Sequence, residues 1–507
     1  MNNDSCSKRL WGVSAQCLLS VAVICLFSAC RQKDRGQAET DIFFLEGHAD
    51  TTYYEQAPFE WHVTLRHDYS ETYVTKFSMC HADYDPEYLG KYRMRDNGKQ
   101  ILFLNCEEAL KAIKGMDALT LGMPKIVYLV GWQYNGHDSK YPAFFAGNDA
   151  IKRPQDEDAL ESIRWLMTEA KKYHTTVSLH INMFDAYPDS PLFDKYVRED
   201  VLAKDKDGKL LIGDWGYKIS YAAEWEKGLT QQRLDSLCHI LPLTDAGTIH
   251  IDAFHNAIPY PLANDNVYTM EHLSPISPWH GHTAIQDMEA RTNIVRYLDK
   301  KGIDVTTEGT SMAINGYIPM YWHYNSMDFA LSLNPHQATG ANSALHVFGN
   351  QFNCEGNFIH DKPFQESFEI FKKGFCEETL IWQYLNRFDR IALITDSLNN
   401  RMALFTEGVR SMWKDERMYV SKDGHLLAEG GNVFIPALWK GNNAIIAFSE
   451  EGYANKTWTL PNGISLSRKA KAWTISVDGQ VEFKKYRIHN HQITLSLAPY
   501  EMILIEE

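Results

Sequence analysis

The sequence predicts a (β/α)8 barrel of the TIM type, followed by a C-terminal antiparallel β-sandwich. Between about residues 99 and 400, apolar strand-like runs alternate with amphipathic helical stretches, which is typical of βα units around a parallel sheet. Each run changes from apolar to polar at its C-terminal end. In a barrel, that end forms the mouth of the active site. After about residue 400, short alternating segments separated by turns predict the sandwich.

The barrel prediction rests on strand-like runs and on the helical stretches between them. The runs cover residues 125–132, 176–182, 248–254 and 303–309. Helical patterns cover residues 156–173 and 286–301. A doubly wound open sheet would show a similar alternation, but no Gly-rich fingerprint follows any of these strands. We therefore expect a catalytic barrel over residues 99–400, a β-rich lead-in over 42–98, and a sandwich domain over 401–507.

The length and charge of the chain limit its function. Its 507 residues exceed the roughly 250–300 at which a single core stops growing, so more than one domain is expected. The formal net charge of -15 repels phosphate backbones, and no large cluster of Lys and Arg reverses it locally. We therefore expect no nucleic-acid partner.

The N-terminus predicts export. Lys8 and Arg9 precede an apolar run over residues 21–27, which ends in Ser28-Ala29-Cys30. This pattern is typical of a lipoprotein signal peptide over residues 1–30 that ends at a lipobox, with Cys30 lipidated and residues 31–41 as a tether. A transmembrane anchor is the alternative, but the run is shorter than the ~20 residues that a span needs. We expect an enzyme anchored by lipid to the bacterial outer membrane, facing the periplasm or the cell surface, with no other membrane contact.

Two carboxylates stand at equivalent places in the predicted barrel. Asp252 lies near the end of one apolar strand, and Glu308 lies near the end of a later one. Retaining hydrolysis of a glycosidic bond needs two carboxyl groups about 5 Å apart. A purely structural carboxylate at such a place would need a buried partner. The pattern therefore points to a glycoside hydrolase. A structural role for Asp252 and Glu308, as partners in buried salt bridges, is the alternative.

Several motifs together resemble the endo-α-N-acetylgalactosaminidases, glycoside hydrolase family 101. Residues 125–142, with Gly-His-Asp-Ser at 136–139 and Tyr-Pro at 141–142, resemble the first barrel strand and loop of that family. His180-Ile181-Asn182 resembles its next strand end. Residues 250–252 resemble the family's nucleophile strand, and residues 306–309 resemble its acid/base strand. The resemblance extends from about residue 95 to 400.

This resemblance implies a retaining enzyme that cleaves α-linked N-acetylgalactosamine from O-glycans of mucin-type glycoproteins. It places the nucleophile on Asp252, the acid/base on Glu308 and a substrate-binding carboxylate on Asp138. His137, His180 and Asn182 are expected to line the same substrate site.

Two departures from the family keep other functions open. The chain is shorter than the multi-modular family members, and the stretch between the two carboxylates is longer than theirs. An exo-acting α-N-acetylgalactosaminidase, another α-galactoside hydrolase and a non-catalytic carbohydrate-binding lipoprotein therefore remain as alternatives.

Two further residues have competing interpretations. Asp138 follows Gly136-His137 in a loop, where an Asx-turn is the structural alternative to hydrogen bonding of sugar hydroxyls. Trp215 lies in a Gly-flanked loop, where it fits a stacking platform for a sugar and core packing equally well.

The sequence predicts no metal and no cofactor. Three of the candidate histidines come from strands that we expect to face different ways, and none forms the helical His-x-x-x-His pair. These candidates are His180, His250, His255, His280 and His282. The Asp-Lys-Asp-Gly at 205–208 lacks the spacing of a calcium loop and predicts a hairpin turn. The expected partner is a carbohydrate substrate.

Overall fold

A computed structural model describes residues 43, 45, 50–53, 60–82, 100–212, 216–254, 277–308, 316–321, 338–339 and 346–507. The chain divides into two units, Met1–Phe44 and Leu45–Glu507, and the second contains all of the described helices and strands. The predicted signal peptide with Cys30 and the whole tether over residues 31–41 lie outside the described residues. Among the described helices, none combines the length and the apolar character that crossing a membrane requires.

A seven-stranded sheet in the order β12-β11-β10-β9-β6-β5-β2 carries the candidate site, and all of its neighbouring strands are parallel. Every residue of β2, β5 and β10 is buried, as expected for a parallel sheet that is covered on both faces. The strands are β2 (Tyr73–Ser78), β5 (Lys125–Val130), β6 (Thr175–Asn182), β9 (Thr248–Asp252), β10 (Asp304–Thr307), β11 (Met320–Tyr321) and β12 (Ala338–Thr339). This confirms the predicted parallel sheet. Closure into an eight-stranded barrel stays a prediction.

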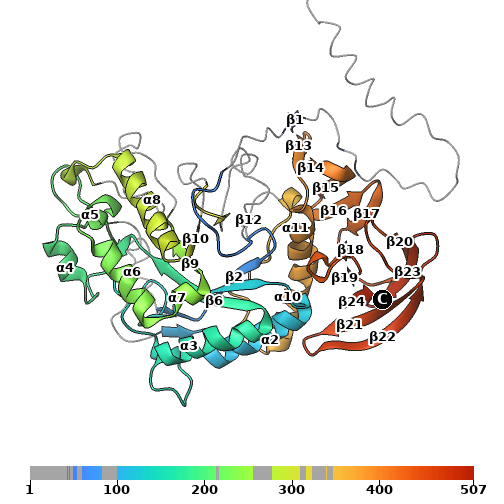
Figure 1. Cartoon of the computed structure of the whole chain (residues 1–507), viewed down its shortest axis with the longest axis horizontal. Helices are drawn as coiled ribbons and strands as arrows, with labels where there is room; N and C mark the ends of the chain where they lie inside the picture. The colour runs from blue at the N-terminus through green and yellow to red at the C-terminus, as the bar shows by residue number, and fades with distance from the viewer. Residues whose placement is uncertain are drawn as a thin grey trace, which may run out of the picture. The chain divides into compact units, whose positions relative to one another are not determined.

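Helices precede several of these strands in the chain (Figure 1). The two predicted over residues 156–173 and 286–301 are present as α3 and α8. The N-terminus of α2 is fixed by a capping box of Asn105 and Glu108, which satisfies two backbone N–H groups reciprocally. The α-helices are α2 (Cys106–Thr120), α3 (Ala159–Ala170), α4 (Phe193–Arg198), α5 (Tyr221–Glu226), α6 (Leu229–Ile240), α7 (Leu243–Ala246), α8 (Ala284–Lys300), α10 (Phe364–Gly374) and α11 (Leu380–Leu385). A π-helical turn, Phe375–Thr379, joins α10 to α11.

The predicted lead-in over residues 42–98 is not a separate region. Its strand β2 pairs with β5 and forms the edge of the parallel sheet, so β5 is not the first strand of that sheet. A second strand from this region, β1 (Asp50–Tyr53), pairs instead with β13 (Arg390–Thr395). A third, β3 (Cys80–Ala82), forms a small antiparallel pair with β4 (Gln100–Leu102).

The predicted C-terminal β-region is an eleven-stranded sheet in the order β1-β13-β14-β15-β16-β17-β18-β19-β24-β21-β22. It includes β13 and therefore begins before the predicted boundary at residue 401. The separate pair β20 (Tyr453–Thr459) and β23 (Gln492–Leu497) contributes Trp458, Ile493 and Leu495 to a core shared with this sheet. The remaining strands are β14 (Arg401–Phe405), β15 (Val409–Lys414), β16 (Arg417–Lys422), β17 (His425–Glu429), β18 (Asn432–Pro436), β19 (Ile445–Ser449), β21 (Lys469–Ser476), β22 (Gly479–Arg487) and β24 (Glu501–Glu506).

Candidate active site

The two predicted catalytic carboxylates lie at the same level on neighbouring strands. Thr307 of β10 pairs with Ile251 of β9, so the next positions along the two strands are Glu308 and Asp252. Both side chains are mostly buried, with 18% and 15% of their surface exposed. The register of two parallel strands therefore brings together residues that are far apart in the sequence.

A cavity of about 170 Å³ opens at these strand ends. It contains both carboxylates and four other residues predicted from the sequence: His137, Asp138, His180 and Asn182. Phe184, Asp185, Ala253 and Glu355 complete its lining. Trp215 lies outside the described residues. The predicted substrate residues that the structure describes thus share one polar cavity.

The loop that carries His137 packs closely against the backbone of β3. Gly131 has a φ of 74°, and a Cβ atom there would lie 1.8 Å from the carbonyl oxygen of Cys80. Only glycine fits such an approach. The His137 N–H then donates to that carbonyl at 2.8 Å. Asp138, with a φ of 57°, follows in the left-handed region. This backbone path positions His137 and Asp138 on the wall of the cavity.

Four histidine rings form a row, and two of them, His137 and His180, line the cavity. The ring centroids are 5.2 Å apart between His81 and His137, 5.1 Å between His137 and His180, and 5.2 Å between His180 and His250. His180 and His250 pair in register on β6 and β9. Residues in register on neighbouring parallel strands point to the same side of the sheet. The expectation that the strand histidines face different ways was therefore wrong for this pair.

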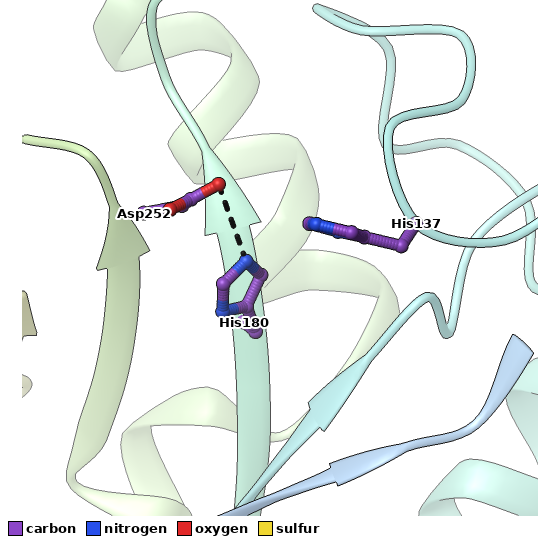
Figure 2. A group of neighbouring side chains, drawn as sticks. All are labelled: His137, His180 and Asp252. Atoms are coloured by element: carbon purple, nitrogen blue, oxygen red, sulfur yellow. Dashed lines mark ion pairs between the residues drawn. The ribbon is translucent and has the colours of Figure 1, made fainter. Parts of the chain in front are cut away.

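His180 is almost fully buried, with 2% of its surface exposed. Within the described part of the chain, neither of its ring nitrogens makes a hydrogen bond. Its Nε2 lies 3.5 Å from Oδ2 of Asp252 (Figure 2). Burial, with smaller contributions from Lys76 and His137, lowers the pKa of His180 well below its usual value. The imidazole is therefore neutral near pH 7.

His137 responds differently to the same surroundings. Burial alone would lower its pKa, but the carboxylates of Asp138, Asp252 and Glu355 outweigh this effect and raise it. The negative charge of the cavity thus favours a cation at its wall.

Lys76 is the main residue that sequence reasoning missed. Its side chain on β2 is 1% exposed, and its ammonium contacts the carboxylate of Glu308. Burial lowers its pKa, but Glu308, Glu355 and Asp252 together raise it above the usual value, so the lysine stays charged. A lysine within the otherwise uncharged β2 needs a buried partner, and this requirement was the available signal.

Asn182 holds a structural place in the site. Its Oδ1 accepts hydrogen bonds from the backbone N–H groups of Phe184 and Asp185, and its Nδ2 donates to Asp185. Asp185 also pairs with Lys218 at 2.6 Å. Through these contacts Asn182 fixes the position of Asp185 at the cavity, and its role in substrate binding stays a prediction.

A side chain of helix α8 fixes the backbone that follows Asp252. Ala253 has a φ of 47°, a conformation that costs free energy for a residue other than glycine. The next carbonyl, of Phe254, accepts a hydrogen bond of 3.0 Å from the fully buried Arg291. Arg291 in turn lies 3.1 Å from Asp287 on the same helix. This contact stabilises the turn that presents Asp252.

Comparison with known families agrees with this geometry. Residues 103–321 match the family model of the endo-alpha-N-acetylgalactosaminidases. This confirms the resemblance predicted from the motifs and supports a glycoside hydrolase. The matched range contains all of the sequence-predicted cavity residues, but neither Lys76 nor Glu355.

Solved structures of several glycoside hydrolases show a distant likeness to this chain. A quadruple mutant of the alpha-N-acetylgalactosaminidase NagBb from Bifidobacterium bifidum is 13% identical, with a TM-score of 0.46 over 69% of this chain and 57% of that chain. The alpha-amylase from Geobacillus thermoleovorans is 10% identical, with a TM-score of 0.41 over 87% and 100%. The GH36 alpha-galactosidase AgaA from Geobacillus stearothermophilus is 12% identical, with a TM-score of 0.41 over 80% and 53%. This chain therefore matches little more than half the length of NagBb, and at these TM-scores the likeness carries no functional argument.

Proposed function

We propose that this protein is a retaining glycoside hydrolase that releases α-linked N-acetylgalactosamine from mucin-type O-glycans. Asp252 is the nucleophile and Glu308 the acid/base. The observation that carries the proposal is the position of both carboxylates at the same level of β9 and β10, within the range that matches the family.

The spacing of strands supports retention over inversion. Neighbouring strands lie about 4.7–4.9 Å apart, close to the roughly 5 Å between the carboxyl groups of retaining enzymes. Inverting enzymes need about 6.5–9.5 Å, to admit a water between carboxylate and sugar. Two carboxylates at one level of adjacent strands therefore favour direct attack by Asp252.

The reaction then proceeds in two steps. Asp252 attacks the anomeric carbon, the bond to the glycosidic oxygen breaks, and Glu308 donates its proton to that oxygen. In the second step Glu308 accepts a proton from a water, whose oxygen displaces Asp252 and leaves the α-anomer. The Lys76 ammonium contacts the Glu308 carboxylate and holds it at the cavity. Asp138 and His137 line the same cavity and supply hydrogen-bonding groups for sugar hydroxyls.

The site of action follows from the N-terminal pattern. A signal peptide with Cys30 as its lipobox cysteine would place the enzyme outside the cytoplasm, on a lipid anchor, where glycoprotein substrates are accessible. Labelling with a palmitate analogue in the native host, and its loss in Cys30→Ala, tests this part of the proposal.

Aryl α-glycosides test the reaction and the donor sugar together. A disaccharide donor, a single N-acetylgalactosamine and a single galactose separate endo action, exo action and α-galactosidase action. NMR of the first product should show the α-anomer. Asp252→Asn should abolish turnover, whereas Glu289→Gln, at an exposed position of α8, is the matched control and should not change it. Unchanged turnover in Asp252→Asn, or a β-anomer released first, would contradict the mechanism.

A further inference from the structure

Three potential metal ligands from separate segments converge in the cavity. His137 comes from the loop after β5, His180 from β6 and Asp252 from β9 (Figure 2). One ligand atom of each lies within 4.8 Å of those of the other two. His180 Nε2 and Asp252 Oδ2 are 3.5 Å apart, close to the roughly 3.3–3.5 Å between ligand atoms that a tetrahedral zinc ion imposes at its usual bond lengths.

We propose that His137, His180 and Asp252 bind one divalent ion of the zinc class, and that this ion blocks the active site. The binding part stands on these residues alone. The inhibition part rests on the proposed function, because it requires Asp252 to be the nucleophile.

The state of His180 points to a missing partner. Only 2% of the surface of this residue is exposed, yet no residue in the described ranges forms a hydrogen bond with either nitrogen of its ring. A buried polar group without a hydrogen bond is costly, and a metal ion supplies the partner that the protein does not. Figure 2 shows the His180 ring nitrogen directed at Asp252 and the His137 ring directed at the same space.

The charge around the cavity favours a cation. Five carboxylates line it: Asp138, Asp185, Asp252, Glu308 and Glu355. Lys218 is paired with Asp185, and Lys76 contacts Glu308. Two imidazoles and one carboxylate suit zinc, copper or nickel, whereas calcium and magnesium prefer oxygen ligands alone.

A second set of possible ligands, His180, His250 and Glu308, overlaps the first. It is the poorer site, because the Lys76 ammonium already contacts Glu308 and would repel another cation there. The ion should therefore lie on the Asp252 side of His180. An Asp252 carboxylate bound to metal cannot attack a sugar, so the ion and the substrate exclude each other.

Titration calorimetry of Zn²⁺ into the chelator-treated full-length protein tests the binding. We expect one ion per chain, and His137→Ala or His180→Ala should weaken the affinity by more than about tenfold, since loss of an outer-shell partner alone costs about 10–100-fold. The matched controls are His81→Ala, the next ring of the row, and His250→Gln, from the second ligand set. Both should stay within about threefold of the unmodified chain. Melting curves establish that each variant is folded. If His180→Ala does not fold, His137→Ala alone tests the site.

Several results would overturn the site. They are the absence of saturable one-to-one Zn²⁺ binding, an unchanged affinity in both His137→Ala and His180→Ala, or a loss in His250→Gln without a loss in His137→Ala. The Co²⁺-loaded protein should also show the absorption of a four-coordinate ion, and this band should disappear in His137→Ala.

Inhibition is measured separately on an aryl glycoside. Zn²⁺ should raise KM and leave kcat unchanged, and Mg²⁺ at the same concentration should do neither. Zn²⁺ binding without any effect on KM would overturn the inhibitory role. Zn²⁺ binding by a protein that hydrolyses no glycoside would overturn the proposed function and leave the metal site intact.

Discussion

Replacing Arg233 by methionine should destabilise the protein strongly, because it leaves a buried carboxylate without its cation. Arg233 on α6 and Glu224 on α5 pair at 2.8 Å, with side chains 2% and 0% exposed. Glu224 also accepts hydrogen bonds from Tyr196 and Thr230, and Arg233 donates to the carbonyl of Met183, directly after β6. The pair therefore joins two helices to the strand that carries His180.

The size of the effect follows from what remains after the change. Methionine keeps the packing volume but removes two charge-assisted hydrogen bonds and leaves Glu224 with hydroxyl donors only. Breaking one partner of a buried pair costs about 3–5 kcal/mol. The second substitution Glu224→Gln removes the buried charge, so the double variant should be more stable than Arg233→Met alone by at least about 1 kcal/mol.

Chemical denaturation followed by circular dichroism measures these free energies of unfolding. Lys301→Met is the matched control, because Lys301 pairs at 2.7 Å with Asp235 of the same helix α6, but the two side chains are 30% and 52% exposed. Its loss should cost less than about 1 kcal/mol. If Glu224→Gln added to the loss caused by Arg233→Met, the stranded-charge explanation would be refuted.

Three further changes have defined outcomes. Glu308→Gln should lower turnover of natural glycans by about 10²–10⁴-fold but spare aryl glycosides with good leaving groups, and equal losses on both would point to another acid. Burial raises the pKa of Asp304 to about 6, so the folded state binds its proton more tightly than the unfolded chain does. Stability should therefore fall by about 2 kcal/mol as the pH rises from 4 to 6. Denaturation of Asp304→Asn across that range should show this pH dependence reduced. Gly131→Ala should destabilise the protein by well over about 1 kcal/mol, because the added Cβ would lie 1.8 Å from the Cys80 carbonyl oxygen. Gly228→Ala, where no atom lies within 4 Å of the added Cβ, should cost only about 1 kcal/mol. Thermal melts of the two variants compare these losses.

The strands that carry the site could be predicted because their chemistry is local. The apolar runs that end in Asn182, Asp252 and the residue before Glu308 all form parallel strands. Strand β2 was not recognised, because Lys76, two hydroxyl residues and a tyrosine interrupt its apolar character. Its burial depends on contacts such as that of Lys76 with Glu308, which no local pattern reveals.

The remaining site residues depend on tertiary structure. Glu355 lies in a segment with no strand or helix of its own, so its place in the cavity is set by the backbone contact of its carbonyl with Ser78. The common orientation of His180 and His250 follows from strand register, which the sequence of a single strand does not specify. By contrast, Asp138 and His137 were found because Gly-His-Asp-Ser at 136–139, followed by Tyr-Pro, resembles a loop of the family.

The pairing of β1 with β13 bears on how this protein can be divided. Residues 50–53 lie beside residues 392–395, so the N-terminal strand completes the edge of a sheet whose other strands all come from the C-terminal part of the chain. A fragment that starts at residue 401 would lack both strands and present β14 as a bare edge, open to pairing with another molecule. A fragment that stops at residue 400 would leave β1 and β13 without the sheet to which they belong. Isolated halves of this chain should therefore aggregate.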